Sequence, residues 1–375
     1  MTDQSAHEIG PLLPSLEVDA ASLVNAPAPS GFEDAHQQRW KGAVGDAADE
    51  LVEDTHGNVL AVAGDTNADD AIAFAAHADQ IGLMVRSIDD DGFLRPGAIG
   101  EVDRTVLPGQ RVEVLTDVES EGPPTPITGV ISQPTRHIRD EEAPTPSAVE
   151  DQRIDIGATG PDDAREEVSI GDPIVFGVET DRMRNGRIVG PGLDNRAGTV
   201  TVAEAFYRLA REELDRPVVA ISTVQEETGQ TGAKFAGRSL GDELELSSVW
   251  ELVSELYVLD VTFATDHPRT PGGFTSEVTL GDGPVVTRGG INDQQAVERA
   301  RTAGKEALGS EDAVQVEAIT GRPGTDTEAF LEHSGGVSTC YIGIPNRYMH
   351  TTSEMVDAGD LADTVELLMA LAAGE

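Results

Sequence analysis

Basic residues are scarce in this chain. Its 375 residues include 26 Lys and Arg against 68 Asp and Glu, a formal net charge of −42. A field of this sign repels nucleic acid and anionic membranes, so neither is expected as a partner. The acidic residues are spread over the whole chain, which indicates a folded protein with a carboxylate-coated surface. Because molar salt shortens the range of such repulsion to about 3 Å, we expect a salt-in halophile as the source.

Cysteine and long apolar runs are also nearly absent. The single cysteine, Cys340, lies in the apolar run VSTCYIGI without a basic neighbour, so we interpret it as a packing residue and expect no intrachain disulfide. No apolar run approaches the roughly 20 residues that a membrane-spanning helix needs. The N-terminal MTDQSAHEIG shows neither the basic nor the apolar part of a secretory signal. The sequence therefore predicts a soluble, cytoplasmic protein.

Helix-like and strand-like segments alternate in both outer parts of the chain. In the N-terminal part the pattern predicts two helices, near 18–25 and from about 31 onward, followed by strands within 51–64 and 71–85. After Gly190 predicted helices and strands alternate over 195–214, 216–224, 232–240, 256–262, 292–308, 337–344 and 362–373. Such alternation is typical of an α/β fold with a mostly parallel sheet covered by helices on both faces.

The pattern changes between about Val85 and Arg187. Short β-like runs alternate there with loops rich in proline and acidic residues, and almost no helical period is left. Strands this short with frequent turn signals are typical of a small β-barrel or sandwich. We predict a catalytic α/β domain formed by residues 1–84 and 187–375, interrupted by a small β-barrel insert over residues 85–186.

Histidines and carboxylates follow the predicted strands at the points where these end. Active residues of open α/β sheets gather at the carboxyl ends of the strands. Taken singly, each residue has an ordinary alternative, such as helix capping for an aspartate or core packing for a lone histidine. Their common location is what favours a site. The candidates are His77, Asp79, Asp194, Glu226, Glu227, Asp260 and His350.

Two adjacent glutamates, Glu226 and Glu227, follow the apolar run VVAISTV (218–224). Neighbours on a regular strand point to opposite faces, so both can serve one site only if the strand stops and the backbone turns. The segment TGQTG (228–232) supplies glycines for such a turn. In so acidic a protein the ordinary alternative is a solvated strand end.

The mixture of imidazole and carboxylate suits two divalent metal ions, Zn²⁺ or Co²⁺. Two metals need a bridging carboxylate and can activate a shared water molecule. Five ligands serve two metals if Asp194 bridges, and Glu226 is then free to act as general base if Asp79 supports His77. That ligand set is His77, Asp194, Glu227, Asp260 and His350.

Six motifs, with PSGFED near the start, resemble in order and spacing the di-metal tetrahedral (TET), glutamyl and deblocking aminopeptidases, of which some relatives are labelled endoglucanases. The resemblance covers the chain from about Pro27 onward. The six motifs are HADQIG, GPGLDNRAG, STVQEETGQTGA, LDVTFATDHP, RPGTDTEAF and IPNRYMHTTSEMV.

The resemblance implies a role for each candidate. His77, Asp194 and Asp260 would hold one metal, and Asp194, Glu227 and His350 the other. Glu226 would be the catalytic base, and Asp79 would orient His77. The β-rich insert would be a dimerisation domain, and dimers would assemble into a hollow dodecamer that admits peptides with a free N-terminus.

Two positions depart from the family pattern, which usually has glutamate at Gln80 and often aspartate at Asn195. Neither position is a proposed ligand, so we expect these departures to affect the fine adjustment of the site rather than activity itself. A di-metal carboxypeptidase or N-acyl-amino-acid deacylase remains an alternative because it would use nearly the same ligands. An endoglucanase would leave His77 and His350 unexplained, and an inactive scaffold would be expected to lack a ligand or the base.

Overall fold

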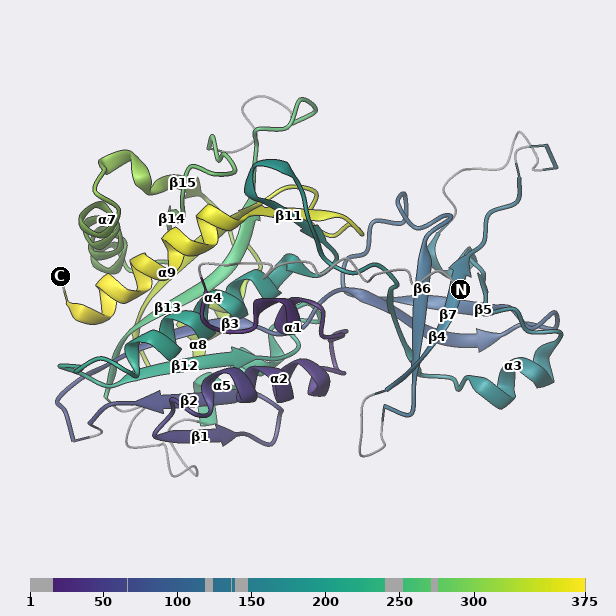
Figure 1. Cartoon of the computed structure of the whole chain (residues 1–375), viewed down its shortest axis with the longest axis horizontal. Helices are drawn as coiled ribbons and strands as arrows, with labels where there is room; N and C mark the ends of the chain where they lie inside the picture. The colour runs from purple at the N-terminus through teal and green to yellow at the C-terminus, as the bar shows by residue number, and fades with distance from the viewer. Residues whose placement is uncertain are drawn as a thin grey trace, which may run out of the picture.

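An eight-stranded sheet forms the larger part of the molecule (Figure 1). The computed structural model describes residues 16–374 apart from 66, 119–123, 136, 139–147, 240–251 and 271–275. The strand order is β1 (Glu50–Glu53), β2 (Val59–Ala63), β12 (Val218–Thr223), β3 (Ala71–His77), β13 (Val253–Phe263), β16 (Ser338–Asn346), β14 (Val285–Gly289) and β15 (Gln315–Ile319). The four central strands, β12, β3, β13 and β16, run parallel to one another.

Helices cover both faces of this sheet. Successive residues of a strand face opposite sides, and in β3 Phe74 belongs to one apolar core whereas Ala73 and Ala75 belong to the other. The first core is completed by α1 (Ala20–Val24), α2 (Asp34–Val44), α4 (Leu193–Leu209), α7 (Gln294–Leu308) and α9 (Ala358–Ala373). The second is completed by α5 (Thr231–Ser239) and α8 (Asp326–His333). The predicted fold class is confirmed.

A closed six-stranded barrel lies beside the α/β part (Figure 1). It has its own apolar core, which includes Leu83, Val112 and Phe176. Its strand order is β4 (Gly82–Ile88), β5 (Leu94–Ile99), β8 (Ile154–Asp155), β7 (Thr125–Ile131), β6 (Arg111–Thr116) and β9 (Pro173–Phe176). The barrel also carries a helix that the sequence did not predict, α3 (Pro161–Glu167), which begins with a proline at its first position.

A small sheet joins the return from the barrel to the C-terminal part. Its strands are β10 (Asp181–Arg182), β11 (Arg187–Gly190) and β17 (Glu354–Asp357). Gly190 pairs with Glu354 in this sheet. The start of α4 is thereby fixed next to the loop that precedes β17, although the two segments are far apart in the chain.

Candidate metal centre

Strand register brings the first histidine and the aspartate of β13 to the same level. Thr223 of β12 pairs with His77 of β3, and Ala75 pairs with Val258 of β13. Two residues further along, Asp260 lies opposite His77. The interpretation of Asp260 as a strand-end residue was wrong, because β13 continues to Phe263 through its pairing with β16.

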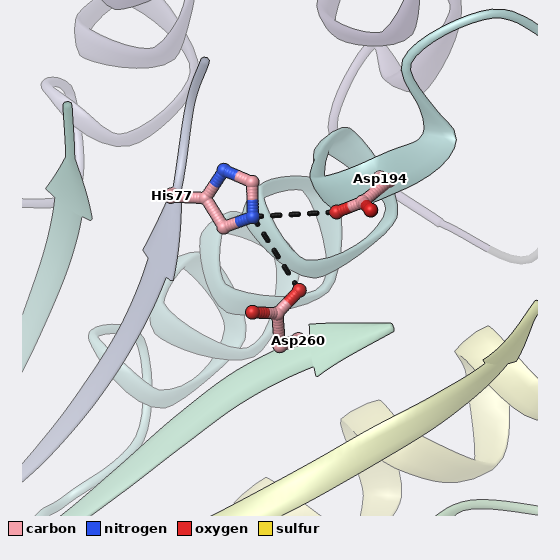
Figure 2. Close-up of side chains that lie close together, drawn as sticks. All are labelled: His77, Asp194 and Asp260. Carbon is pink, nitrogen blue, oxygen red and sulfur yellow. Dashed lines mark ion pairs between the residues drawn. The ribbon is translucent and has the colours of Figure 1, made fainter. Parts of the chain in front are cut away.

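One ring nitrogen of His77 faces two carboxylates, those of Asp194 and Asp260 (Figure 2). Its Nε2 is 3.3 Å from Asp194 Oδ1 and 3.4 Å from Asp260 Oδ1. The other ring nitrogen, Nδ1, lies 3.1 Å from the main-chain oxygen and 3.4 Å from the Oδ1 of Asp79. The ring therefore points one nitrogen at Asp194 and Asp260 and is held on its far side by Asp79. This group of His77, Asp194 and Asp260 is called cluster A.

Asp194 also belongs to a second group, called cluster B, with Glu227 and His350. His350 Nε2 lies 3.4 Å from Asp194 Oδ2 and 3.5 Å from Glu227 Oε2. In each cluster the potential ligand atoms lie within 4.8 Å of one another. Since Asp194 offers Oδ1 to one cluster and Oδ2 to the other, it is the residue that connects them.

Asp194 is not a helix cap. The structure assigns it to the first turn of α4, but its ψ of 106° is not helical, and neither is the conformation of Asn195. The peptide bond between Asp194 and Asn195 is cis. The first-turn N–H of Gly198 donates to Asn195 Oδ1 at 3.1 Å instead, and both carboxylate oxygens of Asp194 face the histidines.

The adjacent glutamates are held by Asp79. The main-chain N–H of Glu226 donates to Asp79 Oδ1 at 2.9 Å, and that of Glu227 donates to Asp79 Oδ2 at 3.0 Å. The backbone leaves the strand at Gln225, whose φ is +56°, and turns so that the N–H of Gly229 bonds to the carbonyl of Glu226. The strand ends before the two glutamates, as their shared site requires. Asp79 therefore contacts His77 and both glutamates at once.

Comparison with known proteins gives the family. The family model for M42 glutamyl aminopeptidases matches residues 57–367. The chain belongs to the M42 glutamyl aminopeptidase family. As an M42 peptidase it is a hydrolase of peptide bonds.

Several relatives of this M42 peptidase resemble it over nearly their whole length. It is 32% identical to a lysyl aminopeptidase of Pyrococcus furiosus over 93% of this chain and 94% of that protein. A solved aminopeptidase of Desulfurococcus kamchatkensis has a TM-score of 0.82 at 29% identity, covering 95% of this chain and 94% of that one. The TET1 peptidase of Pyrococcus horikoshii, described as assembling into a tetrahedron or a large octahedral shell, has a TM-score of 0.78 at 28% identity, covering 93% and 97%.

The electrostatics of the M42 site reflect burial among like charges. Burial raises the pKa of Glu226 and of Glu227 well above the usual range, and the charge of Asp194 adds to the effect on Glu227. Burial alone would lower the pKa of His77, but Asp260 and Asp194 raise it well above 6.5. Burial opposes ionisation of Asp194 too, yet its bonds to His350 and His77 lower its pKa to about 2. The surrounding carboxylates thus raise the pKa of both histidines and favour their charged form.

Sequence reasoning missed Glu354. This fully buried carboxylate accepts the N–H of Asp194 on Oε2 at 2.8 Å and the N–H of His350 on Oε1 at 3.1 Å. Burial, followed by the charge of Asp194, raises its pKa to about 8. Glu354 thus fixes the backbone of two members of cluster B, as Asp79 does for the two glutamates. A glutamate directly before the apolar pair Met355-Val356 of this strand was the available signal.

A second missed carboxylate, Asp326, lies at the start of α8. It is buried and accepts a hydrogen bond from the hydroxyl of Thr223 at 2.5 Å, whereas its Oδ1 has no partner among the described residues. Burial raises its pKa to about 7, against the opposing charge of His77. His267, the histidine nearest to Asp260 in the sequence, lies outside both clusters. Its ring packs edge-on against Tyr348, and its Nδ1 accepts a hydrogen bond from the N–H of Arg269.

The two positions that depart from the family pattern contact neighbouring segments. Gln80 accepts a hydrogen bond on Oε1 from the guanidinium of Arg196. Asn195 donates from Nδ2 to the carbonyl of Leu259 at 2.8 Å, next to Asp260. Within the described part of the chain, no helix combines the length and apolar character needed to cross a membrane.

Proposed function

We propose that this chain is a metal-dependent aminopeptidase that removes N-terminal residues from peptides, with Glu226 as general base. The observation that carries the proposal is the division of Asp194 between two clusters, one oxygen to each. A carboxylate so placed, with two histidines and two further carboxylates around it, is what a pair of divalent ions requires.

The donors fit Zn²⁺ or Co²⁺, which take imidazole nitrogen and carboxylate oxygen. Cluster A would hold one ion and cluster B the other, with Asp194 common to both. Glu227 Oε1 supports this fit, because it is buried and has no hydrogen-bond partner in the described structure. Bound metals would polarise the scissile carbonyl and lower the pKa of a bound water.

The chain's own residues supply positioning and proton transfer. Asp79 fixes the ring of His77 and the backbone of both glutamates, so Glu226 is held beside the clusters without belonging to either. Burial raises the pKa of Glu226 above the usual range of a glutamate, which makes its carboxylate a stronger base than an exposed one. In the proposed role Glu226 takes a proton from the attacking water and delivers it to the leaving amine.

We also propose a homo-oligomer built from dimers that assemble into a dodecamer. This rests on the similarity to two solved TET1 peptidase structures, one described as a dodecamer and one as assembling into a tetrahedron or a large octahedral shell, and on a barrel that stands apart from the sheet (Figure 1). In this proposal residues 85–186 form the dimerisation domain and residues 1–84 with 187–375 the catalytic domain. Light scattering in molar KCl should give the mass of a dodecamer, and a monomer would contradict it.

The test of the activity uses matched peptides, one with a free N-terminus and one N-acetylated, in molar KCl. We expect hydrolysis of the free peptide alone, its loss with a chelator and its return with Zn²⁺ or Co²⁺. Glu226→Gln should abolish turnover while metal content stays near wild type, and retained turnover would overturn the role of Glu226. Hydrolysis of the acetylated peptide would instead favour a deacylase or a carboxypeptidase.

A further inference from the structure

A cavity of about 350 Å³ lies between the barrel and the α/β part. Its wall is formed by the end of α1, strand β9, the segment 177–180 and two residues close to the metal site, Gln80 and Arg196. It shares no lining residue with clusters A and B. The cavity is therefore a separate space, large enough for a small organic ligand.

Arg196 gives the cavity a buried positive charge. Its side chain is only 3% exposed and donates to three main-chain carbonyls, those of Gly192, Val24 and Ala26. Its fourth bond goes to the neutral amide oxygen of Gln80. A guanidinium has five N–H donors, so one remains. No described carboxylate lies within ion-pair distance, and an unpaired buried charge favours an incoming anion.

The cavity also carries charge of the opposite sign. Glu113 of β6 and Glu179 are lining residues, Glu113 half-buried and Glu179 exposed to solvent. A simple anion would be attracted by Arg196 but repelled by these two carboxylates. A ligand with both an anionic and a cationic group satisfies both ends of the cavity.

We propose that this cavity binds a free α-amino acid. Its carboxylate would accept a hydrogen bond from the remaining N–H of Arg196, and its ammonium group would face Glu113 and Glu179. The site stands on the cavity alone and does not depend on the activity proposed above. The proposed small-molecule site lies next to the metal centre in the chain, because the lining residue Gln80 directly follows Asp79.

The test is isothermal titration calorimetry of the metal-loaded full chain in molar KCl. The probes are L-alanine, L-alaninol, which lacks the carboxylate, and N-acetyl-L-alanine, which lacks the ammonium group. We expect one L-alanine per chain and binding of the other two at least about tenfold weaker, the loss of a charge-assisted contact. Absence of L-alanine binding, or equal binding of N-acetyl-L-alanine, would overturn the proposal.

Variants locate the binding. Replacing Glu113 and Glu179 together by Gln should weaken L-alanine but not N-acetyl-L-alanine. Removal of the metals by a chelator should leave L-alanine binding intact. Binding that disappears with the metals, or that survives replacement of Glu113 and Glu179 unchanged, would place the ligand elsewhere and refute the assignment.

Discussion

Replacing Asp79 by Asn tests whether one buried carboxylate organises the site. The aspartate accepts the N–H of Glu226 and of Glu227, one on each oxygen, at 2.9 and 3.0 Å. Asparagine has nearly the same shape but one acceptor oxygen, so its NH₂ group must face one of these two donors. One buried N–H then loses its partner, at a cost of about 1–3 kcal/mol in the free energy of unfolding of the metal-free protein.

The same change weakens metal binding and turnover. His77 Nδ1 loses the carboxylate at 3.4 Å but keeps the main-chain oxygen of Asp79 at 3.1 Å. We therefore expect the low end of the usual effect of such a change, roughly a tenfold loss of metal affinity. Because the backbone of Glu226 is released, kcat at saturating metal should also fall, by about 100-fold for a displacement near 1 Å.

The assays are urea unfolding of the metal-free protein, competition with a chelator and steady-state kinetics, all in molar KCl. Asp155→Asn is the matched control, because Asp155 also accepts a main-chain N–H, from Gly157 at 2.8 Å, but is exposed on the barrel. The control should change the free energy of unfolding by less than about 0.5 kcal/mol. An Asp79→Asn protein with wild-type metal affinity and kcat would refute the reasoning.

Three further predictions concern the ligands and the turn. His350→Ala should lower the bound metal measured by atomic spectroscopy towards one ion per chain, and full occupancy would remove His350 from the ligand set. Because Asp260 and Asp194 raise the pKa of His77 in the metal-free state, metal binding should displace a proton from its ring. Chelator competition should therefore show metal affinity falling as pH falls, by about tenfold per pH unit for each proton displaced. A pH-independent metal affinity would contradict this prediction. Gly232→Ala should lower the free energy of unfolding in urea by about 1–3 kcal/mol, since the added Cβ would meet a main-chain oxygen. The control Gly42→Ala, in open space on α2, should raise it by about 0.5–1 kcal/mol. Equal effects of the two changes would show that the turn after the glutamates is not tightly packed.

The strands and helices that were predicted are those with clear local periodicity. The continuous apolar runs of β3 and β12 and the long helical periodicity of α4 indicate from the local sequence alone that these segments are buried. The short strands β14 and β15 and the helix α8 were not predicted, because their sequences are too short or too polar for one period to dominate. Their structure depends on the neighbours against which they pack.

By itself the sequence determined which residue types stand at the strand ends, and hence the choice of His77, Asp79 and Glu226 as candidates. It did not determine which atoms would meet. That Asp194 divides its two oxygens between clusters, and that Glu354 fixes Asp194 across 160 residues of chain, was decided by the tertiary structure. The physical reason is that periodicity is a local property, whereas the order and register of the strands come from packing between distant segments.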